Sequence, residues 1–242
     1  MKLIYKIIIM KKTLNILLAI VAFGNMSLAQ TDTTVAPKTS NAGYEKFQYG
    51  LSFYQNWTSI EGNTPEYFYK PSVGGGIRVE YYPLNFLGFT AGATFQQRGA
   101  GVIAPDTGFT APSINTYRLR LRFNYFEFPI AVILRTPHGI AGGSVRLSGS
   151  VGIAPSINAE SNQVWHSVED GFHISTNVDN DYAKSDMNIF ASFGPDINTW
   201  GSTLQVHLIA SFGTKNVYNS SGTLSKYNGK NRTYGLRLSW MF

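Results

Sequence analysis

The stretch that decides the fold is RTYGLRLSWMF, residues 232–242. Successive side chains of a strand point to opposite faces, so its residues divide into two sets. One face carries Tyr234, Leu236, Leu238, Trp240 and Phe242, and the other carries Thr233, Gly235, Arg237, Ser239 and Met241. One apolar face and one small or charged face are typical of a transmembrane β-barrel wall, with lipid outside and the lumen inside.

Residues 1–29 predict a secretory signal peptide that is cleaved after Ala29. A basic region precedes an apolar run at residues 14–23, and Ser27 and Ala29 supply the small residues of a cleavage site. The run is shorter than the ~20 residues that a spanning helix needs, which argues against an uncleaved anchor. Residues 30–44 are small and polar and predict a flexible leader, followed by a barrel domain at 45–242.

Composition narrows the function classes. The chain has 20 Lys and Arg against 14 Asp and Glu, and four of the lysines fall in the signal peptide. The mature chain is therefore left with a net charge of about +2, which gives no argument for nucleic-acid binding. Cysteine is absent, so disulfides, cysteine metal sites and a lipidated N-terminus are not expected.

Eight alternating segments follow the leader, and most are about ten residues long, enough to cross a bilayer at a tilt. They cover about 47–57, 72–82, 86–97, 117–134, 144–154, 187–197, 203–212 and 232–242. The connections alternate between short ones and long polar ones at 58–71, 98–116, 155–186 and 213–231. This predicts an all-β, single eight-stranded antiparallel transmembrane barrel with short periplasmic turns, long extracellular loops and both termini in the periplasm.

The fourth segment breaks the pattern. Leu119, Leu121 and Phe123 share one parity, whereas Phe126 and Ile130 share the other. A β-bulge near residue 125 would re-phase the strand. Alternatively, the first half of the segment extends the strand above the membrane.

Alternation alone does not say which face is outside, because a soluble lipocalin-type barrel places its apolar face inside. Here the polar face is rich in Gly, Ser and Thr, which fit a narrow lumen. The apolar face carries Tyr and Trp near strand ends, as interfacial girdles do, and almost no charge. These features favour apolar side chains in contact with outer-membrane lipid.

The chain resembles the PorT-like outer-membrane β-barrel family of Gram-negative bacteria. The resemblance rests on GGGIRVEYY at 74–82, FQQRG at 95–99, YFEFPI at 125–130, SGSVGIAP at 148–155 and the last strand. It implies an eight-stranded barrel and a terminal signal, read by the barrel-assembly machinery, formed by Tyr234, Leu236, Leu238, Trp240 and Phe242. It implies little about activity, although the family's namesake takes part in protein secretion.

Charged residues on the polar face are the first candidate site. Arg78, Glu80, Glu127, Arg146 and Arg237 are expected to face each other inside the narrow barrel, where buried charges must pair. An ion network that plugs the lumen is the favoured interpretation. A gated or narrow polar path is the alternative.

No catalytic, cofactor or metal site is expected. His166, Glu169, Asp170 and His173 lie in one loop with Asp179, Asp181 and Asp186 beyond it, but their spacing matches no established metal site. His207 has Ser211 nearby in sequence and no evident third partner, and there is no Gly-x-Ser-x-Gly element.

The sequence therefore predicts a structural or interaction role through the extracellular loops, with a possible protein partner there. Three alternatives stay open: a narrow channel or small-solute transporter, a component of a secretion assembly, and a lipid-modifying enzyme.

Overall fold

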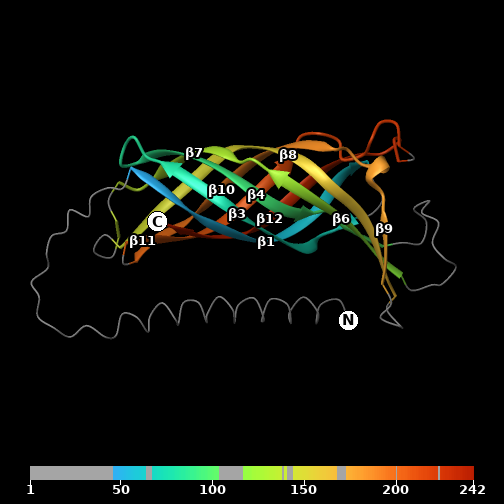
Figure 1. The fold of residues 1–242 in the computed structure, drawn as a ribbon, viewed down its shortest axis with the longest axis horizontal. Helices are drawn as coiled ribbons and strands as arrows, with labels where there is room; N and C mark the ends of the chain where they lie inside the picture. The colour runs from blue at the N-terminus through green and yellow to red at the C-terminus, as the bar shows by residue number, and fades with distance from the viewer. Residues whose placement is uncertain are drawn as a thin grey trace, which may run out of the picture. The chain divides into compact units, whose positions relative to one another are not determined.

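Strands dominate the computed structural model (Figure 1), which describes residues 46–63, 67–103, 117–137, 139–140, 144–167, 173–199, 201–222 and 224–242. The predicted signal peptide and leader lie outside these ranges. Within them, no helix has the length and apolar character to cross a bilayer. The elements are β1 (Phe47–Asn63), β2 (Tyr67–Phe68), β3 (Lys70–Tyr81), β4 (Leu87–Arg98), β5 (Gly101–Ile103), β6 (Tyr117–Glu127), β7 (Ile130–Arg135), β8 (Val145–Ser167), β9 (His173–Asn177), the 3-10 helix η1 (Asp179–Asp181), β10 (Ser185–Thr199), β11 (Ser202–Gly213) and β12 (Asn228–Met241).

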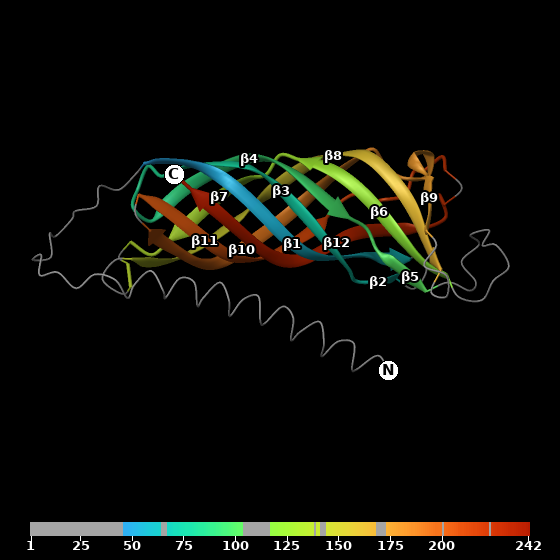
Figure 2. The same cartoon turned by 60° about the horizontal axis from the view of Figure 1, so that its bottom comes forward.

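The strands close into a ring of eight positions: β1, β3, β4, β6 together with β7, β8, β10, β11 and β12 (Figures 1 and 2). Neighbours in the ring pair antiparallel. The first and last strands pair from Gly50 opposite Met241 to Asn63 opposite Asn228, and β10 joins β8 to β11. The predicted eight-stranded antiparallel barrel is confirmed.

Proline interrupts the ring position shared by β6 and β7. Pro129 has no N–H to donate to the ladder, and Pro155 lies on the facing strand β8. The wall stays hydrogen-bonded through the proline carbonyls: Phe128 N donates to Pro155 O at 2.9 Å, and Gly92 N donates to Pro129 O at 3.0 Å.

The predicted orientation of the two faces is also confirmed. On β1, Phe53 is 63% exposed on the outer face and Ser52 is 1% exposed on the inner face. The same sorting along the other strands gives an apolar band around the barrel, which matches a wall that faces hydrocarbon. We call the end of the barrel with the short connections the turn end and the opposite end the loop end.

The structure has an irregularity at the predicted place in the fourth segment, but it does not re-phase β6, and the alternative of a strand extension is right. The inward side chains from Leu119 to Glu127 keep a single parity. The hydrophobic pattern changes parity because the surroundings of the strand change. Within the band, apolar side chains face outward, whereas beyond it they face inward and polar side chains face outward. A register shift does occur beside Tyr125, but the extra residue is Ala159 on the partner strand β8.

Strands also occupy much of the predicted long loops, so those loop assignments are wrong in part. β1 runs to Asn63 and β8 to Ser167, while β2, β5 and β9 lie within segments expected to be irregular. A hydrophobic core explains these extensions, because it gives the inward faces of the strands apolar partners beyond the band. This loop-end core contains Ile60, Ala100, Val102, Leu119, Leu121, Phe123, Tyr125, Trp165, Tyr182, Val217 and Tyr218.

Candidate functional site in the barrel lumen

Glu80 is the centre of a hydrogen-bonded group near the turn end of the lumen. Its side chain is fully buried, and Arg78 Nε lies 2.6 Å from Glu80 Oε1. Tyr82 donates its hydroxyl hydrogen to Oε2 at 2.6 Å, and Gln205 Nε2 donates to the same oxygen at 3.1 Å. A buried carboxylate needs such partners to offset the loss of hydration.

His207 is the centre of a second group. Its Nε2 lies 2.9 Å from Asp196 Oδ1, and its Nδ1 lies 2.7 Å from Arg237 Nη2. Arginine is always a donor, so Nδ1 accepts from Arg237 and Nε2 carries the proton that is donated to Asp196. The imidazole is therefore neutral in this arrangement.

Two serines beside His207 give the arrangement a superficial likeness to a hydrolytic triad. Ser148 Oγ lies 3.0 Å from Nε2, and Ser192 Oγ lies 3.3 Å from Nδ1. A general base needs a free lone pair for the serine proton, but Arg237 occupies that of Nδ1. The sequence does not indicate that these serines lie beside His207. Ser211, the only serine that the sequence suggests as a neighbour of His207, instead accepts a hydrogen bond from Arg98.

Arg98 organises a third group, closer to the loop end. Its Nε lies 2.6 Å from Glu127 Oε1, and both side chains are almost completely buried. The guanidinium also donates to Asn188 Oδ1 at 3.1 Å and to Thr233 Oγ1 at 3.2 Å. The predicted loop at residues 98–116 includes Arg98, whereas the structure places it at the end of β4. The signal for it was present, since Arg98 continues the inward parity of Thr94 and Gln96.

The described contacts of the five residues in the predicted ion network go to different partners. Arg78 pairs with Glu80, whereas Glu127 pairs with Arg98. Arg237 belongs to the His207 group. Arg146 is only half-buried and lies opposite Asp196 in the register of β8 and β10.

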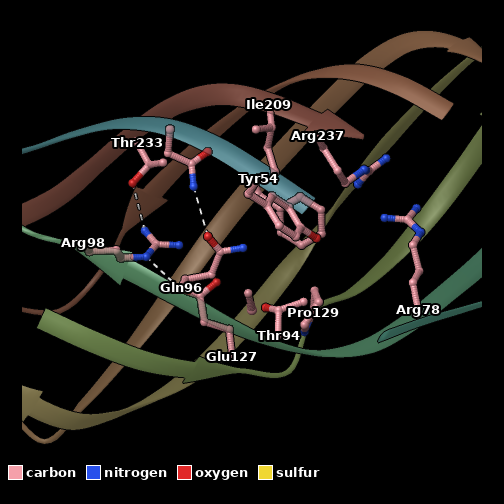
Figure 3. A pocket seen from close by; sticks show the side chains of 13 residues that line it. Tyr54, Arg78, Thr94, Gln96, Arg98, Glu127, Pro129, Ile209, Thr233 and Arg237 are labelled. Atoms are coloured by element: carbon pink, nitrogen blue, oxygen red, sulfur yellow. Dashed lines mark hydrogen bonds and ion pairs between the residues drawn. The ribbon is translucent and has the colours of Figure 1, made fainter. Parts of the chain in front are cut away.

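A cavity of about 30 Å³ separates the charged groups (Figure 3). That volume holds about two water molecules. The guanidinium groups of Arg78 and Arg237 approach one another at one side of it, and Arg98 and Glu127 line another side. Its lining consists of Tyr54, Asn56, Arg78, Thr94, Gln96, Arg98, Glu127, Pro129, Ala154, Phe190, Ile209, Thr233 and Arg237.

The proposed assembly-signal residues lie on the outer face of β12 and just after it. Tyr234, Trp240 and Phe242 are exposed, whereas Leu236 and Leu238 are half-buried. The ring of Phe242 lies 6.3 Å from those of Trp240 and Tyr49, so aromatic side chains cluster where the first and last strands meet.

The acidic residues near η1 serve the local backbone. Asp179 accepts from Ser161 N at 2.6 Å and Asn177 Nδ2 at 3.1 Å. Desolvation raises the pKa of Asp179, but these hydrogen bonds outweigh it and lower the pKa overall. In the described ranges, no three His, Asp or Glu side chains gather as metal ligands do. Glu169 and Asp170 lie outside them, as do the side chains of His166 and His173.

Three solved structures are similar to this chain at low identity and with TM-scores below 0.5. Ail, the attachment invasion locus protein of Yersinia pestis, is 13% identical over 81% of this chain and 99% of its own, with a TM-score of 0.39. Neisserial surface protein A is 11% identical over 80% and 96%, with a TM-score of 0.44. OprG of Pseudomonas aeruginosa is 9% identical over 81% and 94%, with a TM-score of 0.44.

No curated protein matches the chain. Residues 18–219 match the outer membrane protein beta-barrel domain family, and this match covers most of the sequence. Membership implies an integral protein of the outer membrane. The chain belongs to the outer membrane protein beta-barrel domain family.

Proposed function

We propose that this protein is a plugged outer-membrane barrel that acts through its loop end, which faces the cell exterior, with both termini in the periplasm. The main support for the proposal is the pairing of Arg98 with Glu127 beneath the loop-end core. Charged groups fill the lumen at that level, and packed aromatic side chains cover it. A rigid covered barrel is a suitable base for exposed segments that contact partners.

We expect the purified protein to give no steady conductance in planar bilayers, because paired side chains occupy the lumen and the cavity between them holds about two waters. The double variant Arg98→Ala/Glu127→Ala removes side-chain volume at the same level and is expected to conduct more than the wild type. A large, steady open channel from the wild-type protein would contradict the plugged lumen.

A narrow polar path is the second candidate, supported by the cavity itself. Its lining is polar and charged at most positions, as a route for water or small ions requires. Brief, small conductance steps in the wild type that grow in the Arg98→Ala/Glu127→Ala variant would favour this function.

The resemblance to the PorT-like proteins supports a further candidate, a component of a secretion assembly. Cross-linking on intact cells, with the wild type compared with a variant whose residues 168–177 are replaced by a short Gly-Ser linker, tests for a partner at the loop end. Loss of a specific cross-link with an intact barrel is the expected result for an interaction role.

A further inference from the structure

Two buried arginines face each other in the lumen. Arg78 on β3 and Arg237 on β12 both line the lumen cavity, and their guanidinium groups are directed toward one another (Figure 3). The two residues are 5% and 1% exposed. Like charges repel most strongly where water is excluded, so this arrangement requires negative charge close to both groups.

Glu80 supplies that charge to one of the two arginines. Its Oε1 lies 2.6 Å from Arg78 Nε, and its Oε2 accepts hydrogen bonds from the Tyr82 hydroxyl and from Gln205 Nε2. No ion pair within 4.0 Å joins Glu80 to Arg237. The carboxylate therefore balances Arg78.

Arg237 has a neutral partner instead. Its Nη2 donates to His207 Nδ1 at 2.7 Å, and Asp196 lies beyond the imidazole ring, 2.9 Å from Nε2. All eight positions of the ring are described at this level, and none of those strands places a carboxylate within 4.0 Å of Arg237. A buried cation without a counter-charge in contact is costly.

Both guanidinium groups also keep unused donors. A guanidinium has five N–H donors. Among the residues that the structure describes, Arg78 uses its Nε and Arg237 uses its Nη2, while Arg237 Nε is buried without an acceptor. Buried donors that make no hydrogen bond are destabilising. An acceptor that carries negative charge would satisfy both requirements at once.

The backbone keeps space open beside Arg78. Gly50 on β1 and Gly92 on β4 lie directly opposite it in the two flanking ladders, on the same inward face. A Cβ at Gly92 would lie 2.6 Å from the carbonyl oxygen of Ile77, and one at Gly50 would collide with that of Trp240. The close approach of the strands requires glycine at both positions, so no side chain from either flanking strand fills this level of the lumen.

The size and charge of the cavity select the ligand. Three arginines and one glutamate are its charged lining residues, which favours an anion. Its volume of about 30 Å³ has room for about two waters. A chloride ion is only slightly larger than a water molecule, so one chloride and one water fit, whereas the five heavy atoms of phosphate or sulfate do not.

Tyr54 adds a third kind of donor to the same place. It lies opposite Arg237 in the register of β1 and β12, and it lines the cavity between the two arginines' strands (Figure 3). Its hydroxyl can donate a hydrogen bond to an anion there. Hydrogen bonds from charged donors to an anion are stronger than those between neutral groups.

We propose that the lumen cavity binds one chloride ion between Arg78 and Arg237, with the Tyr54 hydroxyl as a further donor. The ion is the counter-charge of Arg237 and links β3 to β12 over the intervening strand β1. The inference goes beyond the proposed loop-end role and does not depend on which end of the barrel faces the exterior.

The first test is the anion dependence of stability. The protein is refolded from urea into detergent in sodium chloride or in sodium gluconate at equal ionic strength, because gluconate is too large for the cavity. A ligand that binds only the folded state stabilises it by mass action. The unfolding equilibrium constant should therefore fall about tenfold for each tenfold rise in chloride above Kd. Equal urea midpoints in the two salts at every concentration would contradict the site.

Variants separate binding from a merely structural role. Arg237→Met should abolish the chloride dependence and lie closer to the wild type in gluconate than in chloride; equal losses in both salts would reject the site. Ser192 Oγ, 3.3 Å from His207 Nδ1, can donate in place of the arginine. Tyr54→Phe keeps both charges and should raise the chloride Kd by about tenfold, the loss of one hydrogen bond to a charged group. The control Arg232→Gln removes a charge from the outer face and should respond to chloride like the wild type.

Bromide locates the ion directly. Crystals of the detergent-purified protein grown in sodium bromide should give an anomalous peak between Arg78 and Arg237, and crystals of Arg237→Met should lack it. A cavity that holds only water would give no peak and would overturn the proposal. Chloride-dependent stability with bromide bound only outside the lumen would overturn it as well, because the effect would then belong to the surface.

Discussion

Replacement of Glu127 by Gln is expected to lower the free energy of unfolding by about 3 kcal/mol, because it leaves a buried arginine without its counter-charge. Arg98 and Glu127 are 4% and 5% exposed, and their 2.6 Å contact is the closest charge pair at this level of the lumen. Asp186, another carboxylate near this level, already accepts hydrogen bonds from Asn231 Nδ2 and Met187 N. Urea unfolding of the detergent-purified protein, followed by tryptophan fluorescence, measures the change.

Two further variants separate the buried charge from a general loss of packing. Arg98→Met/Glu127→Leu removes both charges and should recover most of the lost stability, because apolar replacements of a buried pair are often neutral or better. Glu61→Gln breaks the exposed pair with Arg232 and should cost less than about 1 kcal/mol. A double variant as unstable as Glu127→Gln would show that the charge imbalance is not the cause.

The sequence predicts the wall of this barrel well, for a physical reason. Lipid is a uniform apolar solvent, so each strand that crosses it must keep its apolar residues on one parity, and eight such segments are visible. Where the strands leave lipid, the rule fails. At Leu119, Leu121 and Phe123 the apolar residues of the sequence change to the other parity. The strand itself continues without interruption, and only the solvent around it changes.

The lumen contacts are harder to predict, because parity says that a side chain points inward but not which inward side chain it meets. The stagger between strands decides that, and local irregularities such as the extra residue Ala159 change it. His207 therefore meets Asp196 and Ser148 from two other strands, a set that no sequence spacing indicates. The reason for Arg98 is simpler: the alternating pattern predicts that its strand ends at Gln97, whereas β4 continues to Arg98.

The loop-end core and the transmembrane wall are expected to unfold separately. The loop-end core is held by apolar packing around Phe123, whose ring lies 4.6 Å from that of Tyr182 and 6.4 Å from that of Tyr125. The transmembrane wall is held by strand pairing and by the polar lumen. Regions with different stabilising contacts open with different free energies.

Phe123→Ala is accordingly expected to cost the loop-end core about 3–5 kcal/mol, the usual cost of deleting a buried aromatic ring, and to leave the wall folded. Limited proteolysis should then cleave near Tyr182 and Tyr218, while the barrel keeps its heat-modifiable mobility on gels. The matched control is Phe193→Ala on the lipid-facing surface, where the ring is 58% exposed; its digestion pattern should not change. If Phe123→Ala unfolds the wall together with the loop-end core, the two are one cooperative unit, and the covered end is part of what closes the ring of strands.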